Sequence, residues 1–309
     1  MNVLFFGMGS IGRRHYRIFK EIAPNYQFYA YRREKNVCYN DDLMSVYSWE
    51  EVERIGFSAA LICNPTAMHI EVAIECARRG INLFIEKPLS NSLEGVETLS
   101  RCERDNNLKV LIGVNMRFHP IIERLKELIN TDEEKILRFS AYCGSYLPKW
   151  RDCDYRKTYS AIKEQGGGVI LDLIHELDYS IWLIGQPARI SGVFGTYSDM
   201  EIDVEDCAEM VLEYPGYLGV IHLDYFRPTP KRVIEVVTTK RVLEADLLAG
   251  TLSISNGADT VVEQVSVDRD LTYYKQMDHF NNVLLDKEPP RSTLDEAVGI
   301  LKLAMEFKA

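Results

Sequence analysis

Residues 2–12 read NVLFFGMGSIG, and this stretch decides the fold of the first part of the chain. Its apolar start, which ends at a glycine, is typical of a buried parallel strand. Beyond it, Ile11, His15, Ile18 and Ile22 follow one another at steps of four, three and four. This spacing places them on one face of a helix, so we expect a strand, a tight turn and a helix in that order.

The glycines of this stretch have the spacing G-x-G-x-x-G, with Gly7, Gly9 and Gly12 in the order that a dinucleotide fingerprint requires between a strand and a helix. Gly7 allows the tight turn, Gly9 lets a pyrophosphate approach the backbone, and Gly12 lets the helix pack on the strand. We expect Ser10 and Ile11 to complete the binding turn. The next residues are Arg13 and Arg14, although a helix N-terminus disfavours cations, so either an anion binds there or both side chains point into solvent.

The pattern of a strand followed by a helix continues along the chain. Apolar runs at 26–31, 59–63, 82–86 and 109–114 read as strands, and helical spacing appears around 70–77 and 93–99. Such alternation implies right-handed crossovers and a parallel sheet covered by helices on both faces. We therefore predict an α/β fold that opens with a doubly wound Rossmann domain over residues 1–120.

The residues after the second expected strand bear on which dinucleotide is bound. NAD-binding chains usually carry an acidic residue about 20 residues past the glycines, to hold the ribose hydroxyls. Here that position is Arg32, followed by Arg33 and Glu34. A guanidinium matches phosphate oxygens and suits a 2′-phosphate, whereas Glu34 would suit a ribose. We favour NADP as the cofactor, with NAD as the alternative.

Composition narrows the functional class. The chain has 309 residues, more than one core usually holds, which predicts two domains. Its net charge of −10 and the absence of a long basic run give little support to binding of nucleic acid or an anionic membrane. The apolar N-terminal run is too short for a signal peptide or a membrane span.

The seven cysteines are odd in number and form no C-x-x-C pair, which favours a reducing cytoplasm over a disulfide framework. The histidines and cysteines show no metal-ligand spacing, so we expect no metal.

Several further motifs point to one family. FIEKPLS (84–90), NPTAMH (64–69), NMRFHP (115–120), GGGVILDLIHELD (166–178) and YYKQMDHF (273–280) occur in this order after the glycine motif. Together they resemble the glucose-fructose oxidoreductase, inositol dehydrogenase and rhizopine-catabolism family (Gfo/Idh/MocA). The resemblance covers nearly the whole chain.

That resemblance implies a second, α+β domain over residues 121–309, built on a large, open and mostly antiparallel sheet. Its last helix is expected to pack back on the first domain, and the sheet is expected to pair subunits into a homodimer or homotetramer. The residues agree, because the stretches at 136–144, 188–198, 207–214, 216–226 and 231–240 are rich in β-branched and aromatic side chains.

The resemblance also implies a set of site residues. Lys87 follows a parallel strand at its carboxyl end, where ligands bind in doubly wound sheets, and a lysine there can stabilise charge on a reacting oxygen. The alternative is a solvated lysine beside a structural proline. The remaining expected contacts to the cofactor are Asn64, Pro65, His69, Glu86 and Asn115.

The stretch from Gly166 to Gly185 reads as one buried helix with Gly185 as its C-cap. Asp172 and His175 are three residues apart and would share a face of it. His175 suits proton transfer near neutral pH, and Asp172 would orient the substrate or tune His175 and Lys87. Alternatively, Asp172 starts the helix and His175 is a core histidine. Many family members have four residues from Asp to His. The direction of the Asp172 side chain around the helix axis therefore differs here by about a hundred degrees, one residue's turn.

The last predictions concern a substrate-binding stretch and several acidic residues. In the aromatic and basic stretch 148–168, Tyr155, Arg156 and Tyr159 would bind hydroxyls or an anionic group of the substrate, unless the stretch is a mobile surface loop. We interpret Glu176 and Asp178 as structural. The acidic residues of the loop 203–206 (Asp203, Glu205 and Asp206) we expect to face solvent.

The resulting hypothesis is an NAD(P)-dependent oxidoreductase. It would move a hydride between the nicotinamide and a hydroxyl or ketone of a sugar, a sugar derivative such as a sugar nucleotide, or a cyclitol. Lys87 from the first domain and His175 from the second would meet in the cleft between them. The alternatives are a reductase like biliverdin reductase and a non-catalytic, dinucleotide-sensing regulator of the same fold.

Overall fold

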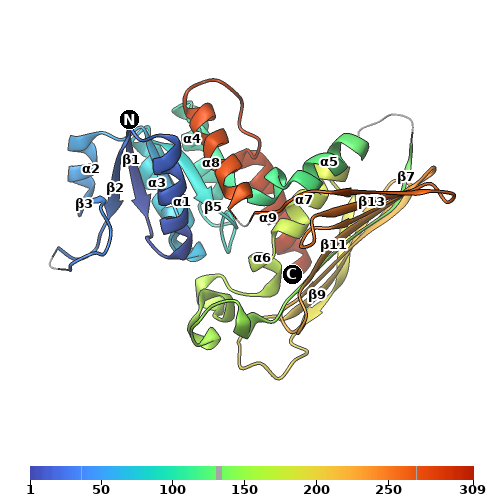
Figure 1. Ribbon diagram of the computed structural model, residues 1–309. Coiled ribbons are helices and arrows are strands. Elements are labelled where there is room, and N and C mark those ends of the chain that lie inside the picture. The colour runs from blue at the N-terminus through green and yellow to red at the C-terminus, as the bar shows by residue number, and fades with distance from the viewer. Residues whose placement is uncertain (36, 130–133, 269) are drawn as a thin grey trace. The chain divides into compact units, whose positions relative to one another are not determined.

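The computed structural model describes residues 1–35, 37–129, 134–268 and 270–309 (Figure 1). By their contacts, these residues form two compact units. The first comprises Met1–Val114 and Tyr273–Leu301, and the second comprises Asn115–Thr272 and Lys302–Ala309. Contacts do not measure which segments fold on their own, so the domain limits 1–120 and 121–309 stay a prediction.

Sheet A, in the first unit, is parallel throughout and has the strand order β3-β2-β1-β4-β5-β6. This is the order of a doubly wound dinucleotide-binding sheet. The order reverses between β1 and β4, and ligands bind outside the carboxyl ends of the strands at such a point. The strands are β1 (Asn2–Phe6), β2 (Gln27–Tyr31), β3 (Met44–Val46), β4 (Ala59–Ile62), β5 (Asn82–Glu86) and β6 (Val110–Gly113).

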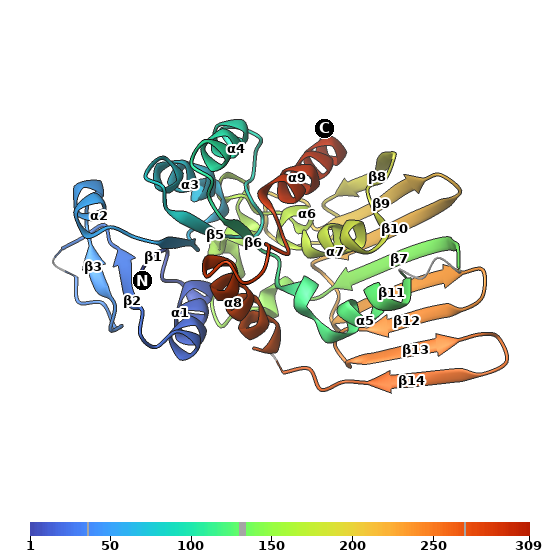
Figure 2. The same ribbon diagram turned by 90° about the horizontal axis from the view of Figure 1, so that it is seen from above.

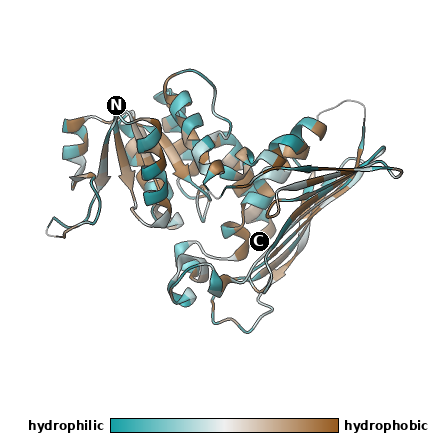
Figure 3. Ribbon diagram, in the orientation of Figure 1, coloured by the Kyte–Doolittle hydropathy of each residue, from teal (hydrophilic) through white to brown (hydrophobic). Residues whose placement is uncertain are grey.

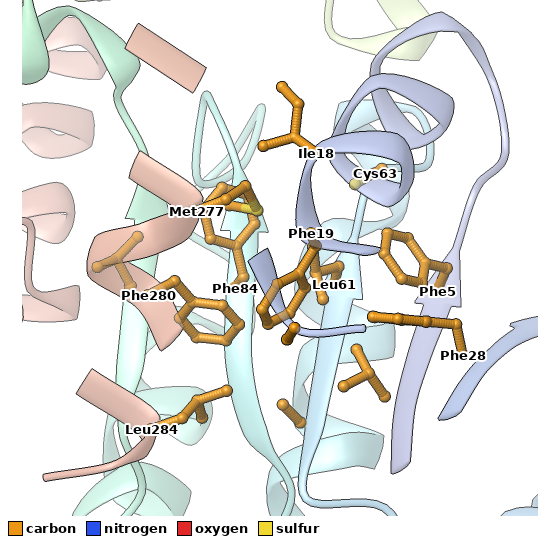
Figure 4. Close-up of a cluster of buried hydrophobic side chains, with 14 of the residues drawn as sticks. Phe5, Ile18, Phe19, Phe28, Leu61, Cys63, Phe84, Met277, Phe280 and Leu284 are labelled. Atoms are coloured by element: carbon orange, nitrogen blue, oxygen red, sulfur yellow. The ribbon is translucent and has the colours of Figure 1, made fainter. Parts of the chain in front are cut away.

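Helices cover this sheet, and Figure 3 shows its strands mainly in the hydrophobic colour. One helix comes from the far end of the chain. Phe280 of that helix, α8, lies with its ring centroid 5.5 Å from that of Phe84 in β5 and 5.9 Å from that of Phe19 in α1 (Figure 4). All three rings are fully buried, which stabilises the unit by about 1.5–3 kcal/mol per side chain. The helices of this unit are α1 (Ser10–Ile22), α2 (Trp49–Ile55), α3 (His69–Arg78) and α4 (Val96–Asp105), together with α8 (Leu271–Leu284) from Tyr273 onward and α9 (Leu294–Lys308) up to Leu301.

Sheet B, in the second unit, has the strand order β14-β13-β12-β11-β7-β10-β9-β8 (Figure 2). Its neighbours pair antiparallel except for β7 and β10. The expected fold class, a Rossmann sheet followed by a mostly antiparallel sheet, is therefore confirmed. The strands are β7 (Ile136–Gly144), β8 (Arg189–Gly195), β9 (Cys207–Tyr214), β10 (Tyr217–Asp224), β11 (Lys231–Thr238), β12 (Val242–Asp246), β13 (Thr251–Ser255) and β14 (Thr260–Gln264).

The two faces of sheet B differ. Helices α5 (Pro120–Ile129), α6 (Val169–Asp172) and α7 (His175–Ile184) lie on one face (Figures 1 and 2). Along β7, Phe139 and Ala141 are buried on this face, and they alternate with Ser140 and Tyr142 on the other. The other face, called the outer face here, bears a shallow groove of about 590 Å³.

Three further features concern the residues that the structure describes. No helix among them has both the length and the apolar character that crossing a membrane requires. Within the same residues, no group of three or more His, Cys, Asp or Glu side chains is arranged to hold a metal ion. All seven cysteines are free thiols.

Candidate functional site

The glycine turn after β1 is built from positions with different constraints. Gly7 has a φ of +89°, and a Cβ there would lie 2.5 Å from the backbone nitrogen of Asn64. A Cβ on Gly12 would collide with the carbonyl oxygen of Gly7. A Cβ on Gly9 would meet no atom within 4 Å. Packing within the chain therefore requires Gly7 and Gly12, while the backbone at Gly9 is open to a ligand.

Helix α1 begins beside this open position. Its N-cap, Gly9, supplies no side-chain cap, and its first turn has no acidic residue. The guanidinium of Arg13 donates to the carbonyl oxygens of Met8 (3.1 Å) and Asn40 (3.2 Å), and that of Arg14 lies 4.7 Å from the ring centroid of Tyr273. Arg13 thus bonds to the turn itself, and Arg14 packs on α8. The amide groups and the positive end of the dipole suit an anion. Ser10 and Ile11 form the start of this helix.

Asn64 follows β4 at the carboxyl edge of sheet A, where the glycine turn also lies. The side-chain oxygen Oδ1 of Asn64 is buried and has no hydrogen-bond partner among the described residues. An orphaned acceptor of this kind suggests a ligand hydroxyl or amide that donates to it. Pro65 follows and leads into a short 3₁₀ turn, Thr66–Met68.

His69 holds this segment in place. Its Nε2 lies 2.9 Å from the carbonyl oxygen of Asn64, and its Nδ1 lies 2.9 Å from that of Pro88. Burial lowers the pKa of His69. The ring therefore ties the segment after β4 to the segment after β5, and both ring nitrogens face backbone carbonyls.

Lys87 directly follows β5, and the residue before it, Glu86, is held by hydrogen bonds. One carboxylate oxygen of Glu86 lies 2.5 Å from Nε2 of His15, and the other accepts the backbone N–H of Lys87 at 3.2 Å. Glu86 and His15 are both buried. Glu86 is thus turned into the protein and fixes the backbone from which the Lys87 side chain starts.

Arg32 has a partner that the sequence did not reveal. Its Nη2 lies 2.6 Å from both carboxylate oxygens of Asp41, and its guanidinium lies 4.0 Å from the ring centroid of Tyr39. Arg32 is buried, whereas Arg33 is exposed and contacts the sulfur of Met68 at 3.7 Å. A 2′-phosphate would therefore meet Arg33 directly and would compete with Asp41 for Arg32.

In the second unit, the single helix expected between Gly166 and Gly185 is wrong. The chain forms two helices, α6 and α7, and Leu173 between them has φ −97° and ψ 30°. There the amides of Ile174 and Glu176 bond three residues back, to the carbonyl oxygens of Leu171 and Leu173. The tighter turn interrupts the regular α-helix, so shared helix spacing does not explain the pair Asp172 and His175. Gly185 caps α7 as expected, with φ +88°.

Asp172 ends α6 and is buried, with both carboxylate oxygens bonded. The Tyr159 hydroxyl donates to Oδ1 at 2.6 Å, and the Tyr225 hydroxyl donates to Oδ2 at 3.1 Å. Because α6 has four residues, Asp172 is both its last residue and part of its first turn, and its carboxylate accepts hydrogen bonds from two tyrosines. No motif of the sequence marks Tyr225.

His175 is the first residue of α7 and is 8% exposed. Two acidic residues after His175 hold α7 in place through arginines. Glu176 lies 2.6 Å from Nε of Arg232, and Asp178 binds the buried Arg117 through two hydrogen bonds, of 2.9 and 2.7 Å. These two acids are structural, as expected.

The other residues predicted to bind substrate are placed differently. Arg156 is half exposed, and its guanidinium is paired with Asp154 (2.9 Å) and Glu201 (2.7 Å). The Tyr155 hydroxyl accepts the backbone N–H of Glu201 at 3.3 Å. Both therefore lie in a surface network. Asn115, expected at the cofactor, is buried in the second unit, where its amide donates to the hydroxyl of Thr272 at 2.7 Å.

The acidic loop before β9 corrects another expectation. Asp206 is fully buried and accepts hydrogen bonds from the backbone amides of Tyr197 (2.8 Å) and Ser198 (2.9 Å). Glu205 is paired with Lys308 at 2.7 Å. These two carboxylates do not face solvent, because the amides and the lysine that pack against the loop need acceptors there. Asp203 is exposed, as expected.

Comparison with known proteins shows the family to which the chain belongs. Residues 1–114 match the oxidoreductase family with an NAD-binding Rossmann fold, and residues 122–244 match the GFO/IDH/MocA C-terminal domain. The chain belongs to the Gfo/Idh/MocA family. The alternation of strand and helix around the glycine turn and the motifs listed above predicted this membership correctly.

Curated relatives share part of their length with this Gfo/Idh/MocA chain. It is 30% identical to the 2,7-anhydro-N-acetylneuraminate hydratase of Mediterraneibacter gnavus over 144 residues, 47% of this chain and 36% of that protein. It is 30% identical to the myo-inositol 2-dehydrogenase of Thermotoga maritima over 184 residues, 56% of this chain and 51% of that protein. The matches thus cover between about a third and about half of these relatives.

Solved structures share the Gfo/Idh/MocA fold over the whole chain. A levoglucosan dehydrogenase in complex with NADH and levoglucosan gives a TM-score of 0.86 at 14% identity, covering 100% of this chain and 96% of that one. The NAD complex of GenD2, from gentamicin A biosynthesis, gives 0.83 at 20% identity, covering 100% and 93%. At these identities the likeness concerns the fold.

Proposed function

We propose that this chain is an NAD(P)-dependent oxidoreductase acting on a hydroxyl or ketone of a sugar, a sugar derivative or a cyclitol. The observation that carries the proposal is the turn at Gly9. Its backbone is open where a pyrophosphate would lie, and it precedes an uncapped helix at the point where the strand order reverses. The named sugar and cyclitol dehydrogenases among the relatives support the substrate class.

The residues present fit a dinucleotide. The turn from Gly7 to Gly12 would hold the pyrophosphate, and the orphaned oxygen of Asn64 would accept a hydrogen bond from the nicotinamide half. When bound, the nicotinamide supplies the position that takes up or returns a hydride. We propose NADP as the preferred form, on the basis of Arg33 and Arg32.

The chain's own residues would handle the oxygen and its proton. In the oxidation, the carbon loses its C–H electron pair as hydride, and the hydroxyl proton passes to His175 as the C=O bond forms. The Lys87 ammonium donates a hydrogen bond to that oxygen and stabilises its developing negative charge. Asp172 accepts from a neighbouring substrate hydroxyl. In the reduction the same groups act in reverse, and His175 returns the proton.

Two variants test these roles. Purified protein is screened with both dinucleotides against sugars, sugar nucleotides and cyclitols, by following nicotinamide absorbance. His175→Asn removes the titrating nitrogen, so we expect turnover to fall by about 10²–10⁴-fold with unchanged cofactor affinity. Lys87→Met should also reduce turnover. Full activity of His175→Asn would contradict the role of His175, and a loss of folding would identify it as a core histidine.

The screen also needs a second readout. One relative is named as a hydratase, and addition of water leaves the nicotinamide absorbance unchanged. Product masses are therefore measured in every reaction. Specific dinucleotide binding with no chemical change in any substrate class would favour the regulator, and turnover of a tetrapyrrole alone would favour the biliverdin-reductase-like alternative.

We also propose the assembly and the compartment. A homodimer or homotetramer would form through the outer face of sheet B, and the seven free thiols suit a reducing cytoplasm.

A further inference from the structure

Glu86, the last residue of β5, links a buried histidine to the backbone of Lys87. One oxygen of its carboxyl group lies 2.5 Å from Nε2 of His15, and the other accepts the backbone N–H of Lys87 at 3.2 Å. The side chain of His15 is 0% exposed and that of Glu86 is 9% exposed. The hydrogen bond between them holds whichever of the two groups carries the shared proton. His15 therefore acts on the backbone of Lys87 through one intermediate side chain.

Both members of this pair have little room to move. A Cβ on Gly113 in β6 would lie 2.9 Å from Oε1 of Glu86, so the carboxyl group fits only against a residue without a side chain. The ring centroid of His15 lies 4.9 Å from that of Phe84, two residues before Glu86 on β5, and 5.8 Å from that of Tyr273 in α8. Its Nδ1 is buried and has no hydrogen-bond partner among the described residues. Nε2 is thus the ring nitrogen that ties His15 to the chain.

The backbone on the other side of Lys87 is also held by a histidine. The carbonyl oxygen of Pro88 lies 2.9 Å from Nδ1 of His69. His15 belongs to α1, which begins at the glycine turn, and His69 begins α3, which follows the segment of Asn64. These are the two segments that would hold the dinucleotide in the proposed function. Two buried histidines thus fix Lys87 to the dinucleotide edge of sheet A.

We propose that His15 is a positioning residue, which fixes the backbone of Lys87 through Glu86 and so brings the Lys87 ammonium to the reacting oxygen in a productive place. The proposal rests on the proposed function, in which Lys87 touches that oxygen. A displacement of about 1 Å is enough to remove much of the effect of a catalytic group. His15 moves no proton of the substrate and acts only through Glu86.

Four variants separate this hydrogen bond from simple packing. His15→Gln keeps a donor near the place of Nε2, whereas His15→Leu fills the space without one. Glu86→Gln keeps the size of the side chain, but its amide serves both neighbours only if His15 carries its proton on Nδ1, which no acceptor faces among the described residues. Phe19→Leu is the matched control, because Phe19 is also fully buried on α1 and packs on Phe280.

The first measurement needs no substrate. In protein labelled with ¹⁵N at lysine, the backbone amide of Lys87 gives one NMR signal, and Lys87→Arg identifies it by its loss. Hydrogen exchange of this amide should be faster by up to about tenfold in His15→Leu and in Glu86→Gln, the size expected for one net hydrogen bond. In His15→Gln and Phe19→Leu the rate should stay near that of the wild type.

This measurement decides whether His15 holds the backbone. Unchanged exchange in a folded His15→Leu protein overturns the proposal, and so does a His15→Gln protein that exchanges as fast as His15→Leu, because ring packing alone would then explain His15. If His15→Leu does not fold, Glu86→Gln takes its place, and unchanged exchange in that variant overturns the proposal in the same way.

The second measurement is turnover of the substrate that the screen identifies. We expect His15→Leu and Glu86→Gln to lower kcat by about 10–100-fold, with smaller changes in KM and in cofactor affinity, and His15→Gln to keep most of the activity. Faster exchange with an unchanged kcat in His15→Leu overturns the positioning role. If the wild type converts no substrate, the proposed function fails, and the exchange rates alone decide whether His15 holds Lys87.

Discussion

Gly9 and Gly12 are three residues apart, yet the structure predicts opposite outcomes when each gains a methyl group. In Gly12→Ala the new Cβ collides with the carbonyl oxygen of Gly7, so stability should fall by about 1–3 kcal/mol. In Gly9→Ala it meets nothing within 4 Å, so the thermal midpoint should stay near that of the wild type. Cofactor affinity should nevertheless fall by roughly tenfold or more, because the methyl group occupies the place of the pyrophosphate.

Thermal unfolding and cofactor titration of the two variants check this pair of predictions. A Gly9→Ala protein that binds both dinucleotides as tightly as the wild type would show that the turn is not the binding site.

His222, on the outer face of sheet B, lies between two carboxylates and couples stability to pH. Its Nδ1 lies 2.5 Å from Glu209 and its Nε2 lies 2.9 Å from Asp224. A neutral imidazole has one N–H, so only the imidazolium can donate to both acids. Burial by itself lowers the pKa of His222, but the hydrogen bonds to Asp224 and Glu209 outweigh burial and raise the pKa.

The sign of the effect follows from a folded pKa above the unfolded one. The contribution of His222 to stability is fully present below the unfolded pKa of about 6.5, and it is lost as the pH rises through the folded pKa. The free energy of unfolding of wild type minus that of His222→Gln should therefore shrink with rising pH, by about 1 kcal/mol or less because Glu209 is partly exposed. Denaturant unfolding at a series of pH values measures this, and a difference that grows with pH would contradict it.

At the scale of elements, we propose that Arg32 and Arg33, which follow β2, set the choice of dinucleotide. If Arg33 meets a 2′-phosphate, Arg33→Ala should weaken NADPH binding by roughly 1.5–3 kcal/mol and leave NADH unchanged. Arg32→Ala should weaken NADPH selectively as well. Asp41→Asn removes the competing anion from Arg32 and should tighten NADPH binding.

Fluorescence titration of both reduced cofactors at equal ionic strength measures these differences. Equal or tighter binding of NADH by the wild type would reject the NADP preference, and Glu34 would then be the residue to test at the ribose.

Elements with strong periodicity were predictable, and those set by tertiary partners were not. The alternation along 136–144 and 207–214 matches β7 and β9, because one face of each strand is buried. The break between α6 and α7 carries no Gly or Pro. The apolar pattern therefore continues across it and predicted a single helix. The short β3 and the last two strands of sheet B, β13 and β14, have too few buried side chains to show a clear pattern.

The same distinction holds for the candidate site. The glycine turn and Lys87 were recognisable because local motifs carry them. The partners of Arg32 and Asp172 were not, since Asp41 and Tyr225 carry no motif and Tyr225 is 53 residues away from Asp172 in the chain. Contacts of this kind arise from strand order and register, which single-sequence patterns do not contain.

At the scale of the whole molecule, the outer face of sheet B is the surface through which we propose that subunits pair. Its groove is lined by apolar and charged side chains together, including Val220, Val233, Lys231 and Glu244. A two-fold axis brings the same patch of each copy together, so lysines and glutamates on one face can pair across it. Leu218 is 51% exposed and lies two residues from Val220 on β10, hence on this face.

This face makes the oligomeric state testable with one variant and one control. We expect the wild type to sediment as a homodimer or homotetramer at micromolar concentration, and Leu218→Arg to dissociate it, because an unpaired charge buried in an interface is costly. Leu93→Arg is the control, since Leu93 is exposed to a similar degree (44%) but belongs to the first unit. Leu93→Arg should keep the oligomeric state and the thermal midpoint of the wild type, and Leu218→Arg should stay folded after it dissociates. A wild type that sediments only as a monomer would contradict the proposed assembly. A stable oligomer in Leu218→Arg would instead move the interface away from this face.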